Sequence, residues 1–371
     1  MSEKIWFRRF SKNLYSIAAL MPLIDAGLTD EPRPGIMLYS FATAQADEVY
    51  REVSNAQVDA VYVAGGPHPS AEPEEGLKFF DYVVIGEGEE TLPELIDVLK
   101  KGEEPGMVRG VAYKKDGRVI FTGSRPTVDL DLYPPFRRIL APLEISRGCP
   151  WRCAYCQTPR LCGSKMRHRS VPVILKYARL HKDIRFTSPN ALAYGSDGLS
   201  PRLDKVESLL RALAELKRPI YFGTFPSEVR PEFVSVQALE LITKYCSNRV
   251  LNIGAQSGSP KVLKAICRGH DVEAVETACQ LCRDQGIKPL VDFIFGLPME
   301  TAGDQQLSLE LIEKIIADGG SVRAHYFTPL PGTPLARTTP ATVADQVARE
   351  LGKLALQGKL TGSWLAKGRT S

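Results

Sequence analysis

The fold of this chain is decided by residues 143–156, LEISRGCPWRCAYC. A short apolar run, which reads as a strand, leads into Cys149, Cys153 and Cys156, so three thiolates with the spacing C-x3-C-x2-C lie on one loop. A structural zinc site usually takes four protein ligands, whereas a cubane [4Fe-4S] cluster held by three cysteines keeps one iron open for a substrate. The sequence therefore predicts an iron–sulfur site capable of chemistry, with zinc as the less favoured alternative.

Downstream of this loop, strand and helix signals alternate. The strand patterns lie at 143–147, 184–187, 219–224, 250–255, 290–295 and 322–328. The helix patterns lie at 170–181, 201–216, 231–246, 259–267, 271–286 and 303–318. Six βα units predict a partial parallel (βα)6 barrel over residues 142–335, with reactive groups at the carboxyl ends of its strands. We expect residues 336–371 to form a C-terminal helical extension.

The first part of the chain also alternates. Within residues 1–105, strands are expected at 35–41, 58–63 and 82–85, and helices at 13–26, 46–53 and 92–100. This order predicts an α/β domain with a Rossmann-like parallel sheet. Residues 106–141 differ, because GVAYKKDGRVIF reads as a hairpin turning at Asp116-Gly117, followed by Pro126, Pro134 and Pro135. We interpret them as a linker with a small sheet.

Two glycine-rich loops, 64–70 and 86–91, follow strands of the predicted Rossmann-like sheet. Ligands bind at the carboxyl edge of open parallel sheets, where glycine lets the backbone approach closely and helix N-termini offer free N–H donors. An ordinary strand–helix turn explains each loop equally well, and the glutamates argue against a phosphate cradle. The candidate ligand-binding residues are Gly65, Gly66, Pro67, His68, Gly86, Glu87, Gly88, Glu89 and Thr91.

Composition limits the class of protein. The chain is 44% hydrophobic and 24% charged, with a net charge of +4 and no block of like charges, so nucleic-acid binding is not expected. No apolar run is long enough for a membrane helix, and the eight cysteines form no secreted disulfide framework. We therefore expect a cytoplasmic enzyme. Cys279 and Cys282 fall on a helix pattern and are expected to be buried rather than to bind metal.

The cysteine spacing, with Tyr155 before the last cysteine and the loop on the first strand of a six-unit barrel, resembles the radical S-adenosylmethionine (SAM) superfamily. Three later segments agree in order: NIGAQSGS at 252–259 with Arg268-Gly-His270, FIFGLP at 293–298 and FTPLPGTP at 327–334. Upstream, GGPHP at 65–69 and DYVVIGEGEET at 81–91 resemble the cobalamin-binding domain of the B12-dependent branch. Together the resemblances cover nearly residues 10–335.

The resemblance implies a [4Fe-4S] cluster on the three cysteines, SAM on the open iron and cobalamin between the two glycine-rich loops and the barrel mouth. One SAM would supply a methyl group through methylcobalamin, and a second would give the 5′-deoxyadenosyl radical that activates an sp3 carbon. The chain looks like methanogen members of this branch, which include a glutamine C-methyltransferase of methyl-coenzyme M reductase. We expect a peptide or protein substrate, an external one-electron reductant and no membrane partner.

The same resemblance indicates which residues surround SAM. Tyr155, Gln256 and Ser257 are expected beside it, although a capped strand–helix turn is as good an explanation of each of the latter two. The second-strand Gly-Gly-Glu that often holds the SAM amino group is absent, so Ser188 and Asn190 are its candidate substitutes. The Asp-x-His-x-x-Gly signature is also absent, and no protein histidine is expected as lower axial ligand of cobalt.

Three alternatives remain open. A tRNA methylthiotransferase shares the barrel motifs, but residues 1–148 contain no cysteine for the auxiliary cluster of that family, and no basic tail is visible. A non-methylating radical enzyme, such as a cyclase or oxidase, would leave cobalamin idle. An iron–sulfur binding or electron-transfer protein would not turn over SAM at all.

Overall fold

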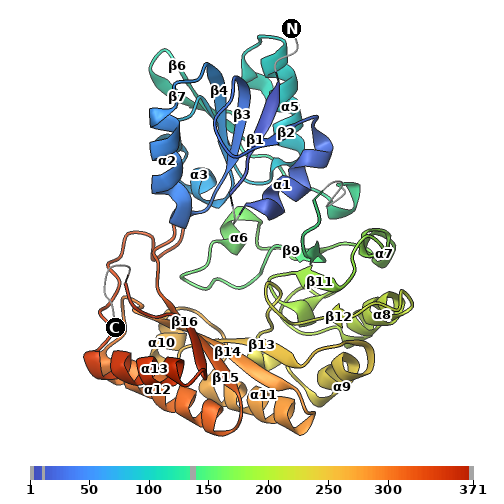
Figure 1. The fold of residues 1–371 in the computed structure, drawn as a ribbon, viewed down its shortest axis with the longest axis vertical. Helices are drawn as coiled ribbons and strands as arrows, with labels where there is room; N and C mark the ends of the chain where they lie inside the picture. Colours follow the sequence, from blue (N-terminus) through green and yellow to red (C-terminus); the bar gives the residue numbers. More distant parts are fainter. Residues whose placement is uncertain (1–3, 11–12, 134–138, 367–371) are drawn as a thin grey trace. The chain divides into compact units, whose positions relative to one another are not determined.

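The structure is a computed structural model that describes residues 4–10, 13–133 and 139–366 (Figure 1). The chain separates into two compact units, the first with residues 1–141, 160–163 and 330–332, and the second with the remainder. Pro134 and Pro135 of the predicted linker, and residues 367–371 of the predicted extension, lie outside the described residues. In the described part, no helix is long and apolar enough to cross a membrane.

The first unit is an α/β domain built on one sheet, in the order β2-β1-β3-β4-β5-β6-β7. β1 to β5 pair in parallel, whereas β6 and β7 are antiparallel additions at one edge. The strands are β1 (Ile5–Arg8), β2 (Gly27–Thr29), β3 (Gly35–Ser40), β4 (Ala60–Gly65), β5 (Tyr82–Val84), β6 (Val111–Lys115) and β7 (Arg118–Phe121). The helices are α1 (Leu14–Leu20), η1 (Met21–Leu23), η2 (Thr43–Gln45), α2 (Ala46–Asn55), α3 (Pro67–Ala71), α4 (Pro73–Gly76), α5 (Gly88–Lys100), η3 (Pro105–Met107) and η4 (Leu130–Leu132). The predicted Rossmann-like class is confirmed.

Both faces of this sheet are covered, because successive residues of a strand point to opposite sides. On β3, Ile36 and Leu38 join one buried cluster, together with Leu95 of α5. Met37 and Tyr39 join a second buried cluster on the other face, which includes residues of α2. Buried apolar side chains on both faces explain why this strand reads as a continuous hydrophobic run.

Two features of the first unit differ from the sequence prediction. β1 and β2 were not predicted, since both are short. The hairpin does turn at Asp116 and Gly117, with φ of 50° and 74°, as a two-residue turn of this type requires. It is not a separate small sheet, however, because Tyr113 of β6 pairs with Tyr82 of β5 and extends the main sheet.

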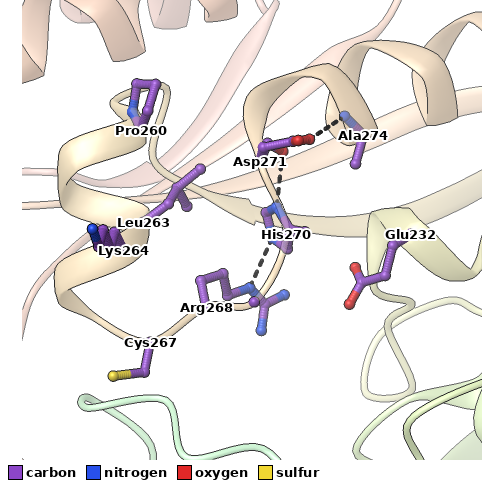
Figure 2. Close-up of a pocket in the computed structure, with 10 residues that line it drawn as sticks. Glu232, Pro260, Leu263, Lys264, Cys267, Arg268, His270, Asp271 and Ala274 are labelled. Carbon is purple, nitrogen blue, oxygen red and sulfur yellow. Dashed lines mark hydrogen bonds between the residues drawn. The ribbon is translucent and has the colours of Figure 1, made fainter.

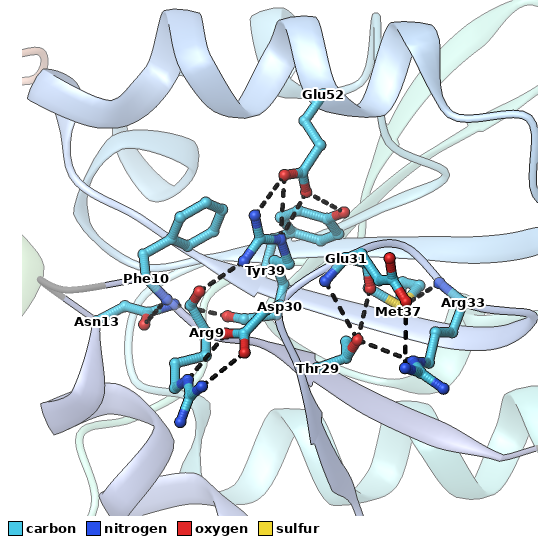
Figure 3. A network of polar contacts seen from close by, with 11 residues as sticks. Arg9, Phe10, Asn13, Thr29, Asp30, Glu31, Arg33, Met37, Tyr39 and Glu52 are labelled. Carbon is cyan, nitrogen blue, oxygen red and sulfur yellow. Dashed lines mark hydrogen bonds and ion pairs between the residues drawn. The ribbon is translucent and has the colours of Figure 1, made fainter.

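A polar network fixes β1 in the sheet (Figure 3). The Arg8 guanidinium donates to both carboxylate oxygens of Glu52 on α2, at 2.8 Å from Nε and 2.6 Å from Nη2. The Tyr39 hydroxyl on β3 donates to the same carboxylate at 2.9 Å, and burial raises the pKa of that phenol. Arg9 pairs with Asp30 after β2 at 2.6 Å. These contacts join β1 to three neighbouring elements.

The second unit is a partial parallel barrel. Its described strands run in two parallel sheets, β12-β11-β8 and β13-β14-β15-β16, and in a short antiparallel pair, β10-β9. Val229, which follows β12, forms an isolated parallel bridge with Ile253 of β13. The strands are β8 (Leu143–Glu144), β9 (Ser146–Arg147), β10 (Arg167–His168), β11 (Ile184–Thr187), β12 (Ile220–Tyr221), β13 (Val250–Gln256), β14 (Lys288–Phe295), β15 (Ser321–Tyr326) and β16 (Leu360–Ser363). The helices from α6 onward are α6 (Thr158–Leu161), α7 (Val171–Ala178), η5 (Ala191–Ala193), α8 (Leu203–Ala214), η6 (Pro231–Phe233), α9 (Val236–Tyr245), α10 (Pro260–Ala265), α11 (Val272–Asp284), α12 (Ala302–Ala317) and α13 (Asp345–Leu356).

The predicted barrel strands are found in the predicted order, but the C-terminal tail is not wholly helical. After α13, β16 pairs in parallel with β15, with Leu360 beside Val322. Gly362 of β16 has φ of 106°, and a Cβ there would lie 2.1 Å from the Ala324 carbonyl oxygen. A short strand that contains such a glycine has little strand propensity, and it forms because β15 offers a free edge.

The two faces of β13 to β15 differ in polarity. Leu251, Val291 and Val322 are fully buried, as expected for side chains that face the covering helices. One residue further along each strand, the opposite face carries Asn252, Asp292 and Arg323. The inner face of this part of the barrel is therefore polar and charged.

Candidate functional site

The three motif cysteines lie on the loop between β9 and α6, after the first barrel strand. All three are free thiols; Cys153 is buried, and Cys149 and Cys156 are half-buried. Burial raises the pKa of the Cys149 thiol, and the charges of Cys156 and Cys153 raise it further. Cys153 and Cys156 therefore lie near the Cys149 sulfur.

The donor set of this loop is three free thiols, those of Cys149, Cys153 and Cys156. A zinc ion holds its ligands within roughly 2.0–2.3 Å, whereas the irons of a cubane occupy separate corners, so their thiolates stand further apart. Three thiols on one loop match a [4Fe-4S] cluster with one open iron.

The cysteine loop is anchored on the α10 segment. The Ala154 amide donates to the Ile266 carbonyl at 2.9 Å, and the Cys156 amide donates to the Cys153 carbonyl at 3.1 Å. Tyr155 packs against a buried cluster that includes Ala154 and Leu297. The ring of Tyr155 thus helps to hold the loop, while its contact with SAM stays a prediction.

Trp151, between the first two cysteines, is held on several sides. Its indole N–H donates to the Gly198 carbonyl at 2.9 Å, and the Arg230 guanidinium lies 3.7 Å from its ring centroid. Gly269 has φ of 82°, and a Cβ there would approach the Trp151 ring to 2.3 Å. These contacts hold the Trp151 ring in place within the loop.

Beneath the loop lies a buried ion network. Glu144 of β8 accepts from Arg147 at 2.7 Å and from Arg169 at 3.2 Å. His168 accepts a hydrogen bond from the Gly195 amide at Nδ1, and its Nε2 lies 2.7 Å from the Ser196 carbonyl. Because a carbonyl oxygen only accepts, the imidazole proton lies on Nε2. Burial lowers the pKa of this imidazole, so it is neutral and structural.

Gln256 lies where the sequence placed it, at the carboxyl end of β13. Its φ is 76°, a left-handed conformation that is unusual for glutamine, at a register shift in the pairing of β13 with β14. A Cβ on Gly254 would lie 2.6 Å from the side-chain amide nitrogen (Nε2) of Gln256 and 2.8 Å from Nη2 of Arg268. Both side chains therefore converge over Gly254. Backbone strain of this kind gathers at functional sites.

Ser257 has a different environment from Gln256. It is fully buried, and its hydroxyl lies 3.3 Å from that of Ser308 on α12. It also accepts from the Ser259 amide at 3.1 Å. These contacts match the alternative of a buried strand–helix turn, and contact of Ser257 with SAM stays a prediction.

Of the two candidates after β11, Ser188 and Asn190, only Asn190 has side-chain polar atoms that form no hydrogen bond within the described residues. The Ser188 hydroxyl donates to the Asn190 carbonyl at 3.0 Å and is thus engaged locally. Both polar atoms of the Asn190 side-chain amide are buried, and neither has a partner among the described residues. An unpaired buried polar group costs roughly 1–3 kcal/mol, which favours a polar ligand at this position.

In the first unit, the glycine-rich loops are tied to each other. The Ser70 hydroxyl accepts from the Gly86 amide at 3.0 Å. Gly66 has φ of 91°, and a Cβ there would lie 2.7 Å from the Ser40 hydroxyl, so the first loop needs glycine. His68 is buried, with Nδ1 3.2 Å from the hydroxyl of Thr43, which follows β3, and Nε2 3.4 Å from a Glu75 carboxylate oxygen. Its contact with a cofactor stays a prediction.

The second loop uses its acidic and hydroxyl side chains inside the unit. Glu87 accepts from the Val128 amide at 2.8 Å, and the Thr91 hydroxyl donates to the Arg109 carbonyl at 3.2 Å. Glu89 is buried in the first turn of α5, where a carboxylate is favoured by the helix dipole. Glu87 and Thr91 brace the segment after α5, a structural role that the sequence did not predict. Cofactor contact by Glu87, Glu89 and Thr91 stays a prediction, as it does for Gly65, Gly66, Pro67, His68, Gly86 and Gly88.

With this geometry in place, the comparison with known families is decisive. Residues 143–337, which include the cysteine loop and the barrel strands through β15, match the Radical SAM superfamily. The chain belongs to the radical SAM superfamily.

Relatives of this radical SAM protein carry several descriptions. An uncharacterized protein of Methanopyrus kandleri is 27% identical over 72% of this chain, which spans only 61% of that protein. An uncharacterized methyltransferase of Pyrococcus horikoshii is 28% identical, covering 81% of this chain and 68% of that protein. A tRNA-2-methylthio-N(6)-dimethylallyladenosine synthase of Delftia acidovorans is 28% identical, and the alignment covers 95% of this chain and 82% of that protein. The sequence relatives alone do not select one reaction.

Solved structures with a similar fold cover both units of this radical SAM protein. TsrM, a radical SAM methyltransferase from Kitasatospora setae solved with cobalamin and a [4Fe-4S] cluster, superposes with a TM-score of 0.71 at 15% identity, covering 91% of this chain and 77% of that chain. OxsB, a cobalamin-dependent SAM radical enzyme, superposes with a TM-score of 0.63 at 18% identity. The match covers 96% of this chain and 55% of that chain. At these identities the likeness establishes the fold.

The sequence reasoning missed the charged residue beside the loop and a charged network on the inner barrel face. Arg268 was noticed only as part of a motif, yet its Nη1 lies 3.8 Å from the Cys153 sulfur. On the inner barrel face, Arg323 donates to Asp292 at 2.6 Å and to Glu228 at 2.9 Å. Burial, and then the charge of Asp292, raise the pKa of Glu228. No local spacing pattern marks pairs so distant in sequence.

A further titratable group lies in the turn after β14. Glu300 accepts from the Gly296 amide at 2.7 Å and from the Leu297 amide at 3.2 Å. Burial raises its pKa to about 7 from an ordinary 4.5, against the lowering effect of these hydrogen bonds. The folded state thus favours the protonated carboxyl, and this contribution to stability is present below about pH 4.5 and is lost as the pH rises through about 7.

We expect Glu300→Gln to flatten the pH dependence of stability, because glutamine keeps an acceptor oxygen for the two amides but cannot ionise. Relative to wild type, the variant should gain free energy of unfolding between pH 4.5 and 7, by about 3 kcal/mol at most. Urea unfolding across this pH range measures the change. The exposed Glu313→Gln on α12 is the control. Parallel pH profiles for wild type and Glu300→Gln would contradict the assignment.

Proposed function

We propose that this radical SAM protein is a cobalamin-dependent C-methyltransferase that methylates an unactivated sp3 carbon of a peptide or protein residue. The observation that carries the proposal is the pairing, in one chain, of a three-thiol loop on the first barrel strand with a Rossmann-like unit before it. The fold likeness to TsrM, a methyltransferase solved with cobalamin and a [4Fe-4S] cluster, supports it across 91% of this chain.

The residues divide among the proposed cofactors as follows. Cys149, Cys153 and Cys156 would hold the cluster, and Asn190 and Gln256 would contact SAM. The backbone of the loops at 64–70 and 86–91 would contact cobalamin. When bound, these groups supply a methyl group from one SAM and a hydrogen-abstracting radical from a second, with electrons from an external reductant.

The protein's own side chains prepare this site. The Asn190 amide, buried and unpaired among the described residues, offers both a donor and an acceptor to a polar ligand. Gln256, fixed by its strained backbone, presents a second amide at the end of β13. The apolar cluster of Ala154, Val262 and Phe327 excludes water behind the cysteine loop, as radical chemistry requires.

The proposal is tested by anaerobic reconstitution followed by iron and cobalamin counting. The protein is then incubated with SAM bearing a deuterated methyl group and a glutamine-containing peptide of methyl-coenzyme M reductase. We expect one cluster and one cobalamin per chain, 5′-deoxyadenosine and S-adenosylhomocysteine as products, and the label on a peptide carbon. A protein that binds the cluster but no cobalamin would overturn the methyltransferase assignment. An unlabelled peptide beside both products would overturn only the glutamine acceptor.

A second candidate function is methylthiolation of tRNA, favoured by the alignment with the Delftia synthase over 95% of this chain. That chemistry, by the family resemblance, draws on an auxiliary cluster held by N-terminal cysteines. Residues 1–148 of this chain contain none. About four irons per chain would support a single cluster, and about eight would support the alternative.

A further inference from the structure

Arg268 is a buried arginine whose guanidinium is held on every edge. Nη2 donates to the Gly254 carbonyl at 2.6 Å, Nε donates to Nε2 of His270 at 3.0 Å, and Nη1 points to the Cys153 sulfur at 3.8 Å. Its own carbonyl accepts from Arg230. The residue is only 8% exposed, so its side chain has little room for another orientation.

His270 fixes the orientation of Arg268 (Figure 2). Because its Nε2 accepts from Arg268, the imidazole proton must reside on Nδ1, which donates to the Asp271 carbonyl at 3.0 Å. Burial, and then the charge of Arg268, lower the pKa of His270 to about 4. The ring is therefore neutral at neutral pH and remains an acceptor. A hydrogen-bond chain thus runs from the start of α11 to the cysteine loop.

This arrangement places a desolvated positive charge against one of the three motif thiols. Glu232, a carboxylate whose charge also acts on Arg268, is paired with Arg230 at 2.5 Å. Hydrogen bonds to cluster sulfurs and nearby charge are the main means by which a protein sets a cluster's reduction potential. A cation stabilises the reduced form more, since that form carries one more negative charge.

We infer that Arg268, oriented by His270, is a positioning residue that donates a hydrogen bond to the Cys153 thiolate and raises the reduction potential of the cluster. The inference rests on the proposed function, because it requires the cluster on the three cysteines. Its consequence is that an external reductant of given strength reduces more of the protein than it would without Arg268.

The test is an anaerobic redox titration of reconstituted protein, monitored by the electron paramagnetic resonance signal of the reduced cluster. Arg268→Gln should shift the reduced-to-oxidised ratio at least tenfold toward the oxidised form, a fall of about 59 mV for one electron. Arg268→Lys keeps the charge but not the fixed geometry, so its cluster should have a reduction potential between those of wild type and Arg268→Gln. His270→Ala should shift in the same direction by a smaller amount.

Arg283→Gln is the matched control, because Arg283 of α11 pairs with Asp318 away from the cysteine loop. The cluster of this variant should have the wild-type reduction potential. An Arg268→Gln cluster of full iron content with the wild-type potential would overturn the inference. A shift in Arg268→Gln without one in His270→Ala would refute the orienting role of His270. If Arg268→Gln loads no cluster, Arg268→Lys and His270→Ala decide.

Iron and sulfide content separates this inference from the proposed function. Wild-type protein that takes up no cluster would overturn both. An intact cluster with cobalamin absent would overturn the methyltransferase assignment and leave the potential of the cluster to decide on Arg268. An intact cluster whose potential does not respond to either Arg268 substitution would overturn only the inference.

Discussion

Cys153→Ala is expected to abolish SAM cleavage and to lower the iron content of reconstituted protein. The reason is that Cys153 is the buried thiol at the centre of the C-x3-C-x2-C loop, and two remaining thiolates do not retain a cubane with an open iron. Loss of one small buried side chain should cost only about 1 kcal/mol of stability, so the variant should still fold. Chromatography of 5′-deoxyadenosine, with iron counting, measures the effect.

Cys267→Ala provides the matched control. Cys267 lies beside Arg268, in the wall of the pocket shown in Figure 2, but it is exposed and outside the motif. Its replacement should leave iron content and SAM cleavage at the wild-type level. Undiminished SAM cleavage by Cys153→Ala would refute the assignment of Cys153 as a cluster ligand, and with it the basis of the proposed function.

Arg323→Met should produce a large loss of stability. Arg323 donates to both oxygens of Asp292, at 2.6 and 2.8 Å, and to Glu228 at 2.9 Å. The Asp292 side chain is only 5% exposed, so removing Arg323 leaves a buried carboxylate without its cation. The expected cost is about 3 kcal/mol, toward the lower end of the range for broken buried pairs because Glu228 is partly exposed. Urea unfolding at neutral pH measures it.

Two further variants serve as controls for the Arg323→Met prediction. Arg202→Gln removes an arginine from an exposed pair with Asp204 and should change stability little. The double variant Asp292→Asn with Arg323→Met should recover part of the loss, since the buried charge is then gone. Equal stability of Arg323→Met and wild type would show that the network on the inner barrel face is fully solvated.

The local elements of this protein could be predicted from its sequence. The apolar runs that become β11 and β14, the helix patterns between them and the C-x3-C-x2-C spacing depend on residues close together in the chain. The turn at Asp116 and Gly117 was predictable for the same reason. Short strands without strong patterns, such as β1 and β16, were not. Their pairing is decided by the neighbouring strand edge rather than by their own residues.

The sequence by itself thus determined the α/β class, the order of the barrel strands and the loop that carries the three thiols. Only the tertiary structure decided which side chains approach that loop and which pair on the inner barrel face. Arg268 reaches Cys153 across 115 residues of sequence, and Arg323 reaches Glu228 across 95. The physical reason is that strand register and loop packing, which depend on the whole barrel, set these distances. The three-thiol loop is a local pattern, whereas the charge that surrounds it is a property of the fold.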